Sequence, residues 1–460
     1  MNNDYRYLIS SRNDRLAQDA GHRPRFFVRT YGCQMNERDS EKMSALLAAL
    51  GFEQAQSQDD ADFILYNTCC VRESAEDRVF GHLSRLKRMK MDKPSLMIAV
   101  CGCMTQQQEI AQKFEDKLSY VNIVFGTANR HRLPEFIWRT IETGRQVIDI
   151  SGLEEDSPGK LPELDDVPVT TREYPHKAGV NIMYGCDNYC AYCIVPYVRG
   201  REKSRDMDDI LHEAEALAAD GVKEIMLLGQ NVNSYKPGFP ELLRRVNDIP
   251  GLERIRFMTS HPKDFSDELI AAVCDLPKLC KSVHLPLQSG STRILQDMNR
   301  KYTQQEYLTL AQKLTAVGIA LSTDIIVGYP GETEEDFEAT LEVVRKVRFS
   351  GAFTFIYSKR SGTPAAQRTD TVERKIAADR FDRLTAEIYP ILLEINQAKV
   401  GRSLPVMVEG IATSGACKGR ADDYALVHFP CDLPLKQGDI VNVRIDEAKT
   451  FYLNGHVGIK

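Results

Sequence analysis

The sequence lacks any stretch of about 18 apolar residues, the length that a membrane-spanning helix requires. Residues 1–25 carry charges throughout and contain no apolar core of a signal peptide. An excess of positive charge is also missing, because 59 Lys and Arg residues are set against 65 Asp and Glu residues. We therefore expect a cytoplasmic protein with no membrane partner, in which any nucleic-acid-binding surface is a local basic patch.

Twelve cysteines are present, and a reducing compartment keeps such thiols out of disulfides. We accordingly expect metal ligands or catalytic thiols rather than disulfides. Cys186, Cys190 and Cys193 form the pattern C-x3-C-x2-C, and the next cysteine is Cys274. A structural zinc ion would normally have a fourth ligand. An iron–sulfur cluster on three thiolates instead leaves one iron open to an outside molecule; three unrelated buried cysteines are the alternative.

Apolar runs alternate with helical patterns through the first part of the chain. Each run reads as a strand that is followed by an amphipathic helix, which predicts an open parallel α/β sheet covered on both faces. The expected strands are 26–33, 62–69, 96–103 and 121–126.

A second series of six such strands lies between residues 180 and 358. A closed eight-stranded barrel usually needs about 250 residues, so we expect a partial, open (β/α)6 barrel here. From about residue 395 the pattern changes to short alternating strands, typical of a small all-β barrel of the kind that binds oligonucleotides. The predicted parts are an extension (1–24), the α/β domain (25–150), an acidic linker (151–178), the partial barrel (179–392) and the β-barrel (393–460).

A second trio of cysteines, Cys33, Cys69 and Cys103, stands at the ends of three predicted strands. Ligands of open α/β sheets bind beyond the carboxyl ends of the strands, so these thiols are expected to converge although they are far apart in sequence. Cys70 and Cys101 have the wrong phase for this edge. Three isolated cysteines are again the alternative.

The first trio follows the first strand of the predicted barrel, on the rim where barrel enzymes place their active sites. Its spacing resembles the radical S-adenosylmethionine superfamily, in which a [4Fe-4S] cluster binds S-adenosylmethionine through its open iron. Candidate contacts to S-adenosylmethionine are the aromatic residue before the third cysteine and four rim positions, each of which has a structural role as its alternative: Tyr192, Gln230, Ser260, Gln288 and Asp324.

Nearly the whole chain resembles the methylthiotransferase family of radical S-adenosylmethionine enzymes. The matching segments are TYGCQMNERDSE (30–41), NTCCVRESAEDRVFGHL (67–83), CGCM (101–104), GCDNYCAYCIVPYVRGREKSR (185–205), LLGQNVNSY (227–235) and TDIIVGYPGET (323–333). TYGCQMN is similar to the branch that modifies isopentenyladenosine in tRNA. The sequence departs from that branch at Cys70, where alanine is common, and at 235–243, where a longer loop is expected.

The resemblance implies two [4Fe-4S] clusters, an auxiliary one on Cys33, Cys69 and Cys103 and a radical one on the first trio. It implies conversion of N6-isopentenyladenosine at tRNA position 37 into its 2-methylthio derivative, with S-adenosylmethionine as methyl donor and radical source. The C-terminal barrel would be a TRAM domain. Expected partners are the anticodon stem-loop and an electron donor such as flavodoxin or ferredoxin, for a monomeric enzyme.

Other readings stay open. The same chemistry could act on threonylcarbamoyladenosine of tRNA or on a ribosomal-protein aspartate, and a non-catalytic RNA-binding module with structural zinc is a further alternative. Candidate phosphate contacts follow from basic residues near the first trio and in the C-terminal barrel, although charged runs are commonly only a solvated face. They are Arg199, Arg201, Lys203, Arg205, Lys418 and Arg420.

Overall fold

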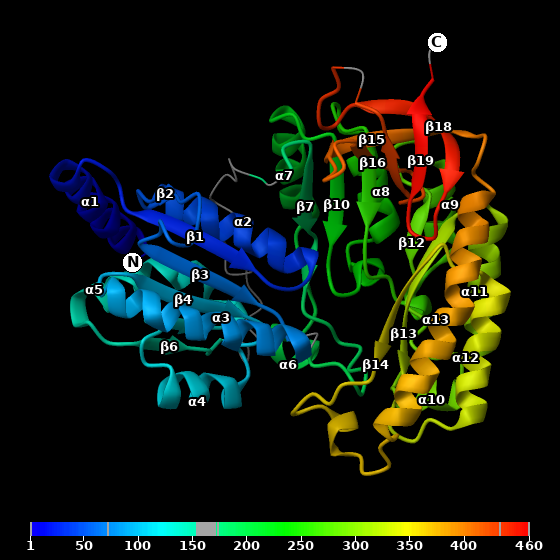
Figure 1. Cartoon of the computed structure of the whole chain (residues 1–460), viewed down its shortest axis with the longest axis horizontal. Coiled ribbons are helices and arrows are strands. Elements are labelled where there is room, and N and C mark those ends of the chain that lie inside the picture. Colours follow the sequence, from blue (N-terminus) through cyan, green and yellow to red (C-terminus); the bar gives the residue numbers. More distant parts are fainter. Residues whose placement is uncertain (1, 71–72, 153–171, 173, 432–433, 459–460) are drawn as a thin grey trace. The chain divides into compact units, whose positions relative to one another are not determined.

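The computed structural model describes residues 2–70, 73–152, 172, 174–431 and 434–458 (Figure 1). Most of the predicted linker, residues 153–171 and 173, lies outside these ranges. The chain divides into two compact units. Unit 1 comprises Met1–Glu173, Tyr184–Asp187 and Ile194–Lys203, and unit 2 comprises Tyr174–Met183, Asn188–Cys193 and Ser204–Lys460. No helix in the described ranges is long and apolar enough to cross a membrane.

Unit 1 is built on a six-stranded sheet with the order β2-β1-β3-β4-β5-β6, in which every pairing is parallel. The four predicted strands are present, and two short edge strands, β2 and β6, extend the sheet. The bounds are β1 Arg25–Thr30, β2 Glu53–Gln54, β3 Phe63–Thr68, β4 Met97–Gly102, β5 Ile123–Phe125 and β6 Val147–Asp149.

Helices cover both faces of this sheet, so the central strand β3 is buried along its whole length. Side chains of α1, α2 and α5 pack on one face, and those of α3 and α4 pack on the other. The predicted extension 1–24 is largely helix α1, which buries Ile9 in the first of these cores. The helices are α1 Asn2–Ala20, α2 Gln34–Ala49, α3 Glu73–Asp92, α4 Gln108–Lys117, η1 Thr127–Arg132, α5 Leu133–Thr143 and α6 Val195–Arg199.

Unit 2 contains the six predicted strands of the open barrel as two three-stranded parallel sheets, β7-β10-β11 and β12-β13-β14. A parallel bridge between Ile255 and Leu279 leads from β11 toward β12. The bounds are β7 Lys177–Asn181, β10 Glu224–Leu228, β11 Arg254–Phe257, β12 Ser282–His284, β13 Ala320–Val327 and β14 Gly351–Ile356; β8 (Met183–Tyr184) and β9 (Lys203–Ser204) are two-residue strands. The partial (β/α)6 barrel is thus confirmed.

Helices follow the barrel strands, and polar side chains fix where several of them begin. Thr303 and Glu306 form a capping box at the start of α11, and Thr333 and Asp336 form another at α12. The helices of unit 2 are α7 Met207–Ala219, η2 Val232–Ser234, α8 Phe239–Asn247, η3 Pro262–Asp264, α9 Asp267–Asp275, α10 Thr292–Asp297, α11 Gln304–Ala316, α12 Glu334–Val347, η4 Pro364–Gln367 and α13 Arg374–Gln397.

The C-terminal strands close into a barrel with the order β15-β16-β17-β19-β18, as predicted for this part of the chain. The alternating apolar positions, such as Val406, Val427 and Val443, form its interior. The bounds are β15 Ser403–Ile411, β16 Cys417–Ala421, β17 Leu426–Phe429, β18 Ile440–Ala448 and β19 Leu453–Val457. Strand β16 was not predicted, because its sequence CKGRA has few strand-forming residues.

This small barrel packs on the amino ends of the strands of the open barrel, within unit 2. Arg254 donates to the carbonyl oxygens of Arg420 and Pro405 at 2.7 and 2.8 Å. Arg256 donates to the carbonyl oxygen of Ala421 at 2.9 Å and stacks over the ring of Tyr424. Buried guanidinium groups that are satisfied by backbone carbonyls fix this contact firmly.

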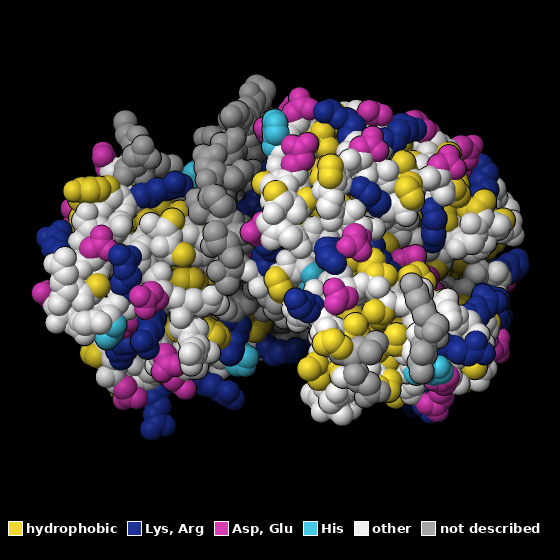
Figure 2. All heavy atoms as spheres, turned by 90° about the horizontal axis from the view of Figure 1, so that it is seen from above, with side chains coloured by type: hydrophobic (Ala, Val, Ile, Leu, Met, Phe, Trp, Pro, Cys, Tyr) yellow, Lys and Arg dark blue, Asp and Glu magenta, His cyan; other side chains and the backbone are white. Residues whose placement is uncertain are grey.

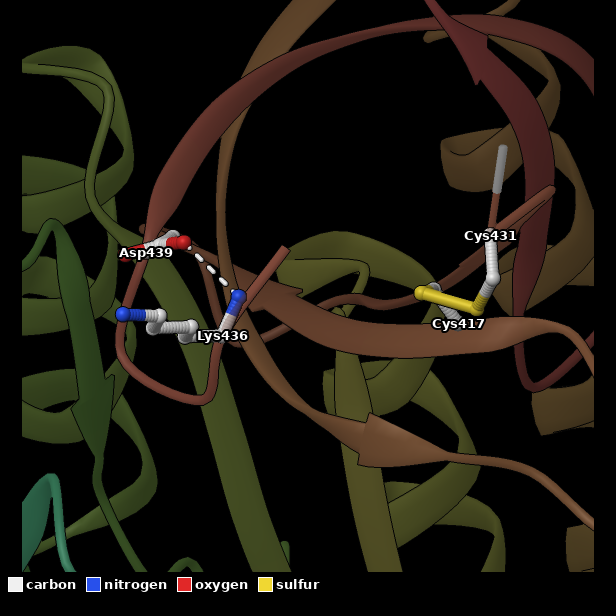
Figure 3. Close-up of a disulfide and its surroundings, with 4 residues drawn as sticks. All are labelled: Cys417, Cys431, Lys436 and Asp439. Carbon is white, nitrogen blue, oxygen red and sulfur yellow. Dashed lines mark hydrogen bonds between the residues drawn. A yellow bond between two sulfur atoms is a disulfide. The ribbon is translucent and has the colours of Figure 1, made fainter. Parts of the chain in front are cut away.

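A disulfide joins Cys417 and Cys431 in the C-terminal barrel (Figure 3). The expectation that no cysteine forms a disulfide was therefore wrong for this pair. The reason is local: β16 and β17 pair in antiparallel fashion with Cys417 opposite Phe429, and Cys431 follows two residues later. The hairpin brings the two Cα atoms to 5.2 Å, which is within the range that a disulfide bridges.

Basic and acidic side chains are intermingled on the face that Figure 2 shows. The formal net charge of the chain is −6. Any surface that attracts RNA phosphates must therefore depend on particular residues, as the composition predicts.

Candidate cluster sites and cofactor contacts

Cys33, Cys69 and Cys103 leave the same edge of the sheet in unit 1. They follow β1, β3 and β4, which are neighbours in the sheet, and the last residues of β3 and β4 are paired with each other. The backbone N–H of Cys103 donates to the carbonyl oxygen of Thr68 at 3.0 Å, directly beside Cys69. Cys69 and Cys103 are buried and Cys33 is exposed, so the edge is open on the Cys33 side.

Two glycines allow the strand ends to approach this closely. A Cβ atom on Gly32 would lie 2.5 Å from the Cβ and 3.0 Å from the Sγ of Cys69, and one on Gly102 would lie 2.2 Å from the carbonyl oxygen of Thr68. Both residues have positive φ angles, 129° and 108°. Any side chain at either position would push the cysteines apart.

The helix that follows Cys33 supplies polar groups behind the trio. Cys33 is the N-cap of α2, and desolvation raises the pKa of its thiol although the charge of Arg199 acts against the rise. The side chain of Asn36 is fully buried and donates to the carbonyl oxygens of Tyr31 and Thr68 at 3.1 and 2.9 Å. This amide therefore ties the ends of β1 and β3 to the first turn of α2.

A buried arginine completes this site. Arg199 lies at the end of α6 and donates from Nε to the Sγ of Cys103 at 3.2 Å. Its Nη2 donates to Asn36 Oδ1 at 2.7 Å and to Asp39 Oδ2 at 3.1 Å. Asp39 is also paired with Arg130. Burial alone would lower the pKa of Arg199, but Cys103 and Asp39 raise it well above the ordinary value, so the guanidinium is charged.

Two neighbours, Cys70 and Arg199, lower the pKa of the Cys103 thiol. A hydrogen bond with Cys70 is the largest influence and, with the positive charge of Arg199, holds the pKa of Cys103 below its ordinary value, at about 6. Cys70 packs with Cys103, Ile194 and Val198 in one small apolar cluster. The phase argument that set Cys70 aside thus missed a direct contact. Cys101 lies in the hydrophobic core, 3.8 Å from the sulfur of Met43.

The donors of this edge fit an iron–sulfur cluster. No group of three or more His, Cys, Asp or Glu residues in the described ranges could hold a single metal ion. A cubane, however, presents a separate iron to each thiolate, so its ligands need not meet at one ion. An anionic cluster requires thiolate ligands, space between them and a compensating positive charge. This edge has three thiols, two glycines that leave room for close approach, and the buried guanidinium of Arg199.

The first trio is divided between the units. Cys186 belongs to unit 1, where its N–H donates to the carbonyl oxygen of Gly200 at 3.2 Å, and Cys190 and Cys193 belong to unit 2. In unit 2 the N–H of Cys193 donates to the carbonyl oxygen of Cys190 at 2.9 Å, which makes a tight turn. Short C-x2-C turns of this kind suit adjacent cluster ligands.

Three consecutive residues after α10 hold the cysteine loop of unit 2. The carbonyl oxygen of Met298 accepts from the N–H of Ala191, and the amide of Asn299 donates to the carbonyl oxygen of Tyr189. Arg300 is buried and donates from Nη1 to the Sγ of Cys190 at 3.4 Å. The chain thus places an arginine against one cysteine of each trio.

Gln230, Ser260 and Gln288 follow β10, β11 and β12 on the carboxyl-end rim of the strands in unit 2, whereas Asp324 lies inside β13 and not at its end, because that strand continues to Val327. Ser260, after β11, is 2% exposed, and among the described residues neither its Oγ nor Oδ1 of the buried Asn231, after β10, has a hydrogen-bond partner. Orphaned buried polar atoms at a barrel rim fit a polar cofactor. Gln230 is half-buried beside Asn231.

The other candidates line the strands of the second sheet. The N–H of Gln288, a residue with a φ of 67°, donates to the carbonyl oxygen of Asp324 at 2.8 Å. Asp324 Oδ2 lies 3.2 Å from Nε2 of His284, so its carboxylate already has a partner on β12. Tyr192 packs beside Met298, and burial raises the pKa of its phenol, with the nearby Cys190 adding to the rise.

The predicted RNA contacts differ in exposure. Arg199 and Arg205 are buried, and Arg205 donates to the carbonyl oxygen of Asn181 at 2.6 Å. The side chain of Arg201 is 61% exposed and pairs with Asp187, and Lys203 is half-buried on β9. RNA contact therefore remains a prediction for the accessible members of the run.

In the C-terminal barrel, the two predicted contacts are both half-buried. Lys418 lies on the outer face of β16, opposite His428 of β17. Arg420 stacks over Tyr424 at 4.4 Å and lies 3.6 Å from a carboxylate oxygen of Glu409, on the side that packs against the open barrel. Phe429 of β17 is part of the core of this barrel.

Reasoning from sequence missed Asn36, Asp39 and Arg300. The first two stand three and six residues after Cys33, so they share a helix face with each other, and polar groups on a buried face are a usable signal. Arg300 gave no such signal, because its contact depends on a loop more than 100 residues away.

Three family models match the chain: the uncharacterized protein family UPF0004 over residues 25–126, the radical SAM superfamily over 180–344 and the TRAM domain over 397–457. The solved radical S-adenosylmethionine methyltransferase TsrM from Kitasatospora setae is similar in fold, with a TM-score of 0.55 at 16% identity over 74% of this chain and 77% of that chain.

Curated relatives match along nearly the entire length. A tRNA-2-methylthio-N(6)-dimethylallyladenosine synthase of Acetivibrio thermocellus is 48% identical over 98% of this chain and 94% of its own. One of Clostridium novyi is 49% identical over 94% of this chain and 96% of its own. Identity at this level over matched full lengths, together with the three domain matches, shows that the chain belongs to the family of the tRNA-2-methylthio-N(6)-dimethylallyladenosine synthases.

Proposed function

We propose that this protein converts N6-isopentenyladenosine, next to the tRNA anticodon at position 37, into its 2-methylthio derivative. The observation that carries the proposal is the identity of 48% to a synthase of that name over 98% of the chain. The protein is accordingly a transferase of the radical S-adenosylmethionine superfamily, with a TRAM domain at its carboxyl end.

Two [4Fe-4S] clusters and S-adenosylmethionine are the proposed cofactors. Cys186, Cys190 and Cys193 would hold the radical cluster, and the second trio, on the sheet edge of unit 1, would hold the auxiliary cluster. When bound, these groups supply the radical and sulfur chemistry that an aromatic C–H bond requires, since such a bond resists polar substitution.

The residues of the chain have positioning tasks in this reaction. The turn at Cys190 and Cys193 is fixed by Met298, Asn299 and Arg300, so the ligands are oriented before any cluster binds. The buried hydroxyl of Ser260 and amide oxygen of Asn231 are available to polar groups of S-adenosylmethionine. These acceptors would orient the cofactor on the rim of the barrel.

The tRNA must present its base outside the stack of the anticodon loop. Arg201 and Lys203 are the accessible cations of the run that follows the radical trio, and Lys418 lies on the outer face of the C-terminal barrel. We propose these residues as phosphate contacts, in a cytoplasmic monomer that receives electrons from a flavodoxin or ferredoxin.

Mass spectrometry of nucleosides from digested tRNA tests the function. A strain that lacks the gene should lose 2-methylthio-N6-isopentenyladenosine and accumulate the unmodified isopentenyladenosine, and the gene should restore the product. Loss of a threonylcarbamoyl derivative, or of a modified ribosomal-protein aspartate, would assign a different acceptor. Anaerobically purified protein should contain iron and acid-labile sulfide; stoichiometric zinc in their place would indicate a non-catalytic RNA-binding module.

A further inference from the structure

Arg199 is held in place from several sides within unit 1. Its Nε lies 3.2 Å from the Sγ of Cys103, and its Nη2 donates to Asn36 and Asp39. The hydroxyl of Thr127 donates to the carbonyl oxygen of Val198 at 2.6 Å, which anchors the end of α6. Only 4% of the Arg199 side chain is exposed, so its position is defined by these internal partners.

The charges around Arg199 do not cancel. Asp39 pairs with Arg199 at 3.1 Å and also with Arg130, so one carboxylate is shared by two guanidinium groups. Arg130 also lies over the ring of Tyr184. The part of the Arg199 charge that Asp39 does not neutralise lies beside the sulfur of Cys103. Cys33 is also near enough to raise the pKa of this guanidinium.

An N–H donor and a positive charge beside a cluster thiolate have two known physical effects. They orient the ligand, and they stabilise the more negative, reduced form of the cluster, which raises its reduction potential. A carboxylate at the same place has the opposite effect on the potential, because it disfavours the added electron.

We propose that Arg199 is a positioning residue of the auxiliary cluster rather than an RNA contact. Its guanidinium fixes the thiolate of Cys103 and offsets the negative charge that three thiolates bring to the sheet edge, while Asp39 limits the size of this effect. The proposal rests on the proposed function, in which Cys33, Cys69 and Cys103 hold that cluster.

The test isolates the auxiliary cluster in the full-length chain. Cys186, Cys190 and Cys193 are replaced by alanine, and the protein is purified and reconstituted anaerobically. Arg199→Gln, Arg199→Lys and Asp39→Asn are then introduced separately, with Arg201→Gln as a matched control from the same basic run. Iron and sulfide per chain, the electron paramagnetic resonance spectrum of the reduced protein and the midpoint potential are measured.

We expect Arg199→Gln to shift the potential to more negative values and to increase iron loss to a chelator about tenfold or more. Arg199→Lys should restore part of the shift, since it keeps the charge but not the planar donor. Asp39→Asn should move the potential in the opposite direction, which a purely structural role would not produce. Arg201→Gln should have the same iron content and midpoint potential as the parent.

Equal potentials and equal iron retention in Arg199→Gln and its parent would overturn the proposal. If Arg199→Gln does not fold, the midpoint potentials of Arg199→Lys and Asp39→Asn provide the test. Shifts of opposite sign support the proposal, and shifts of the same sign contradict it. A parent protein that binds no iron and sulfide would instead refute the auxiliary cluster of the proposed function, and the role of Arg199 would fall with it.

Discussion

The two cysteine trios each place one sulfur against a buried arginine, but the surroundings of the two arginines differ. Arg199 donates to Cys103 at 3.2 Å and shares Asp39 with a second arginine. Arg300 donates to Cys190 at 3.4 Å, and its other acceptors are the neutral oxygens of Tyr302 and Pro286. Within the described residues, no carboxylate lies at ion-pair distance from Arg300.

This difference indicates that the positive charge acts at unequal strength in the two sites. In unit 1 part of the charge of Arg199 is neutralised by Asp39. In unit 2 Arg300 lies over the ring of Tyr302, and Tyr302, Tyr192 and Cys190 raise the pKa of its guanidinium, so its charge is not neutralised by a carboxylate of the described residues. Clusters held by the two trios, as proposed, would therefore differ in how strongly the neighbouring arginine favours an added electron.

The largest expected effect comes from removing either trio. Replacement of Cys186, Cys190 and Cys193 by alanine should abolish both the methylthiolated nucleoside and the cleavage of S-adenosylmethionine, while one cluster remains. Replacement of Cys33, Cys69 and Cys103 should also abolish the product but should leave cleavage to 5′-deoxyadenosine. Liquid chromatography of the reaction, with iron and sulfide analysis, measures both. If the variant without Cys33, Cys69 and Cys103 failed to cleave S-adenosylmethionine, the two trios would not have the separate roles proposed for them.

The next largest effect is expected from replacing Arg300, the arginine beside Cys190. Arg300→Gln should slow cleavage of S-adenosylmethionine about 10-fold to 100-fold, the usual result of losing a partner of a metal ligand. Thermal unfolding should change little, because no carboxylate of the described residues pairs with Arg300 and would be left buried without a partner. An unchanged cleavage rate would show that the contact between Arg300 and Cys190 has no functional part.

A smaller effect is expected at the rim of the barrel. Ser260→Ala should weaken binding of S-adenosylmethionine about threefold to tenfold, which corresponds to one neutral hydrogen bond. Stability should not fall, since the hydroxyl has no hydrogen-bond partner among the described residues. Ser266→Ala is the matched control: Ser266 caps α9 by accepting from the N–H of Leu269, so it should lower stability by about 1 kcal/mol and leave binding unchanged. Calorimetry and thermal melts separate the two; the same binding constant in both variants would remove Ser260 from the cofactor site.

The smallest effect is expected at Cys70. Cys70→Ala removes a hydrogen bond to Cys103 but no proposed ligand, so the iron content should stay the same. The potential of the auxiliary cluster should shift slightly to negative values, less than in Arg199→Gln, because a neutral donor is lost rather than a charge. Loss of a cluster would instead make Cys70 a ligand.

Sequence periodicity was sufficient for the three folded parts, because each depends on a repeated pattern that extends over many residues. The four strands of the α/β domain, the six of the open barrel and the closed C-terminal barrel were all predictable. Short pieces with no repeat, such as β2, β6 and β16, were not. The placement of Cys33, Cys69 and Cys103 on one edge followed from the assignment of three parallel strands that end near these cysteines.

The partners of the cysteines could not be predicted in the same way. Arg199 and Arg201 belong to one basic run and look alike in sequence, yet one is buried against Cys103 and the other is largely exposed. Ile194 and Val198, on either side of the helix start before Arg199, pack with Cys70 in a contact between distant segments that sequence periodicity does not reveal. Disulfide formation between Cys417 and Cys431 likewise required the hairpin register.

The docking of the small C-terminal barrel has a consequence for how this enzyme is dissected. Truncation before residue 397 would uncover Arg254, Arg256 and Glu224 and remove the carbonyl oxygens that satisfy both arginines. A shortened protein would therefore lose activity for two reasons: the open barrel would be less stable, and tRNA would bind less tightly. Point changes on the outer face, such as Lys418→Ala, are the cleaner route to the contribution of that module.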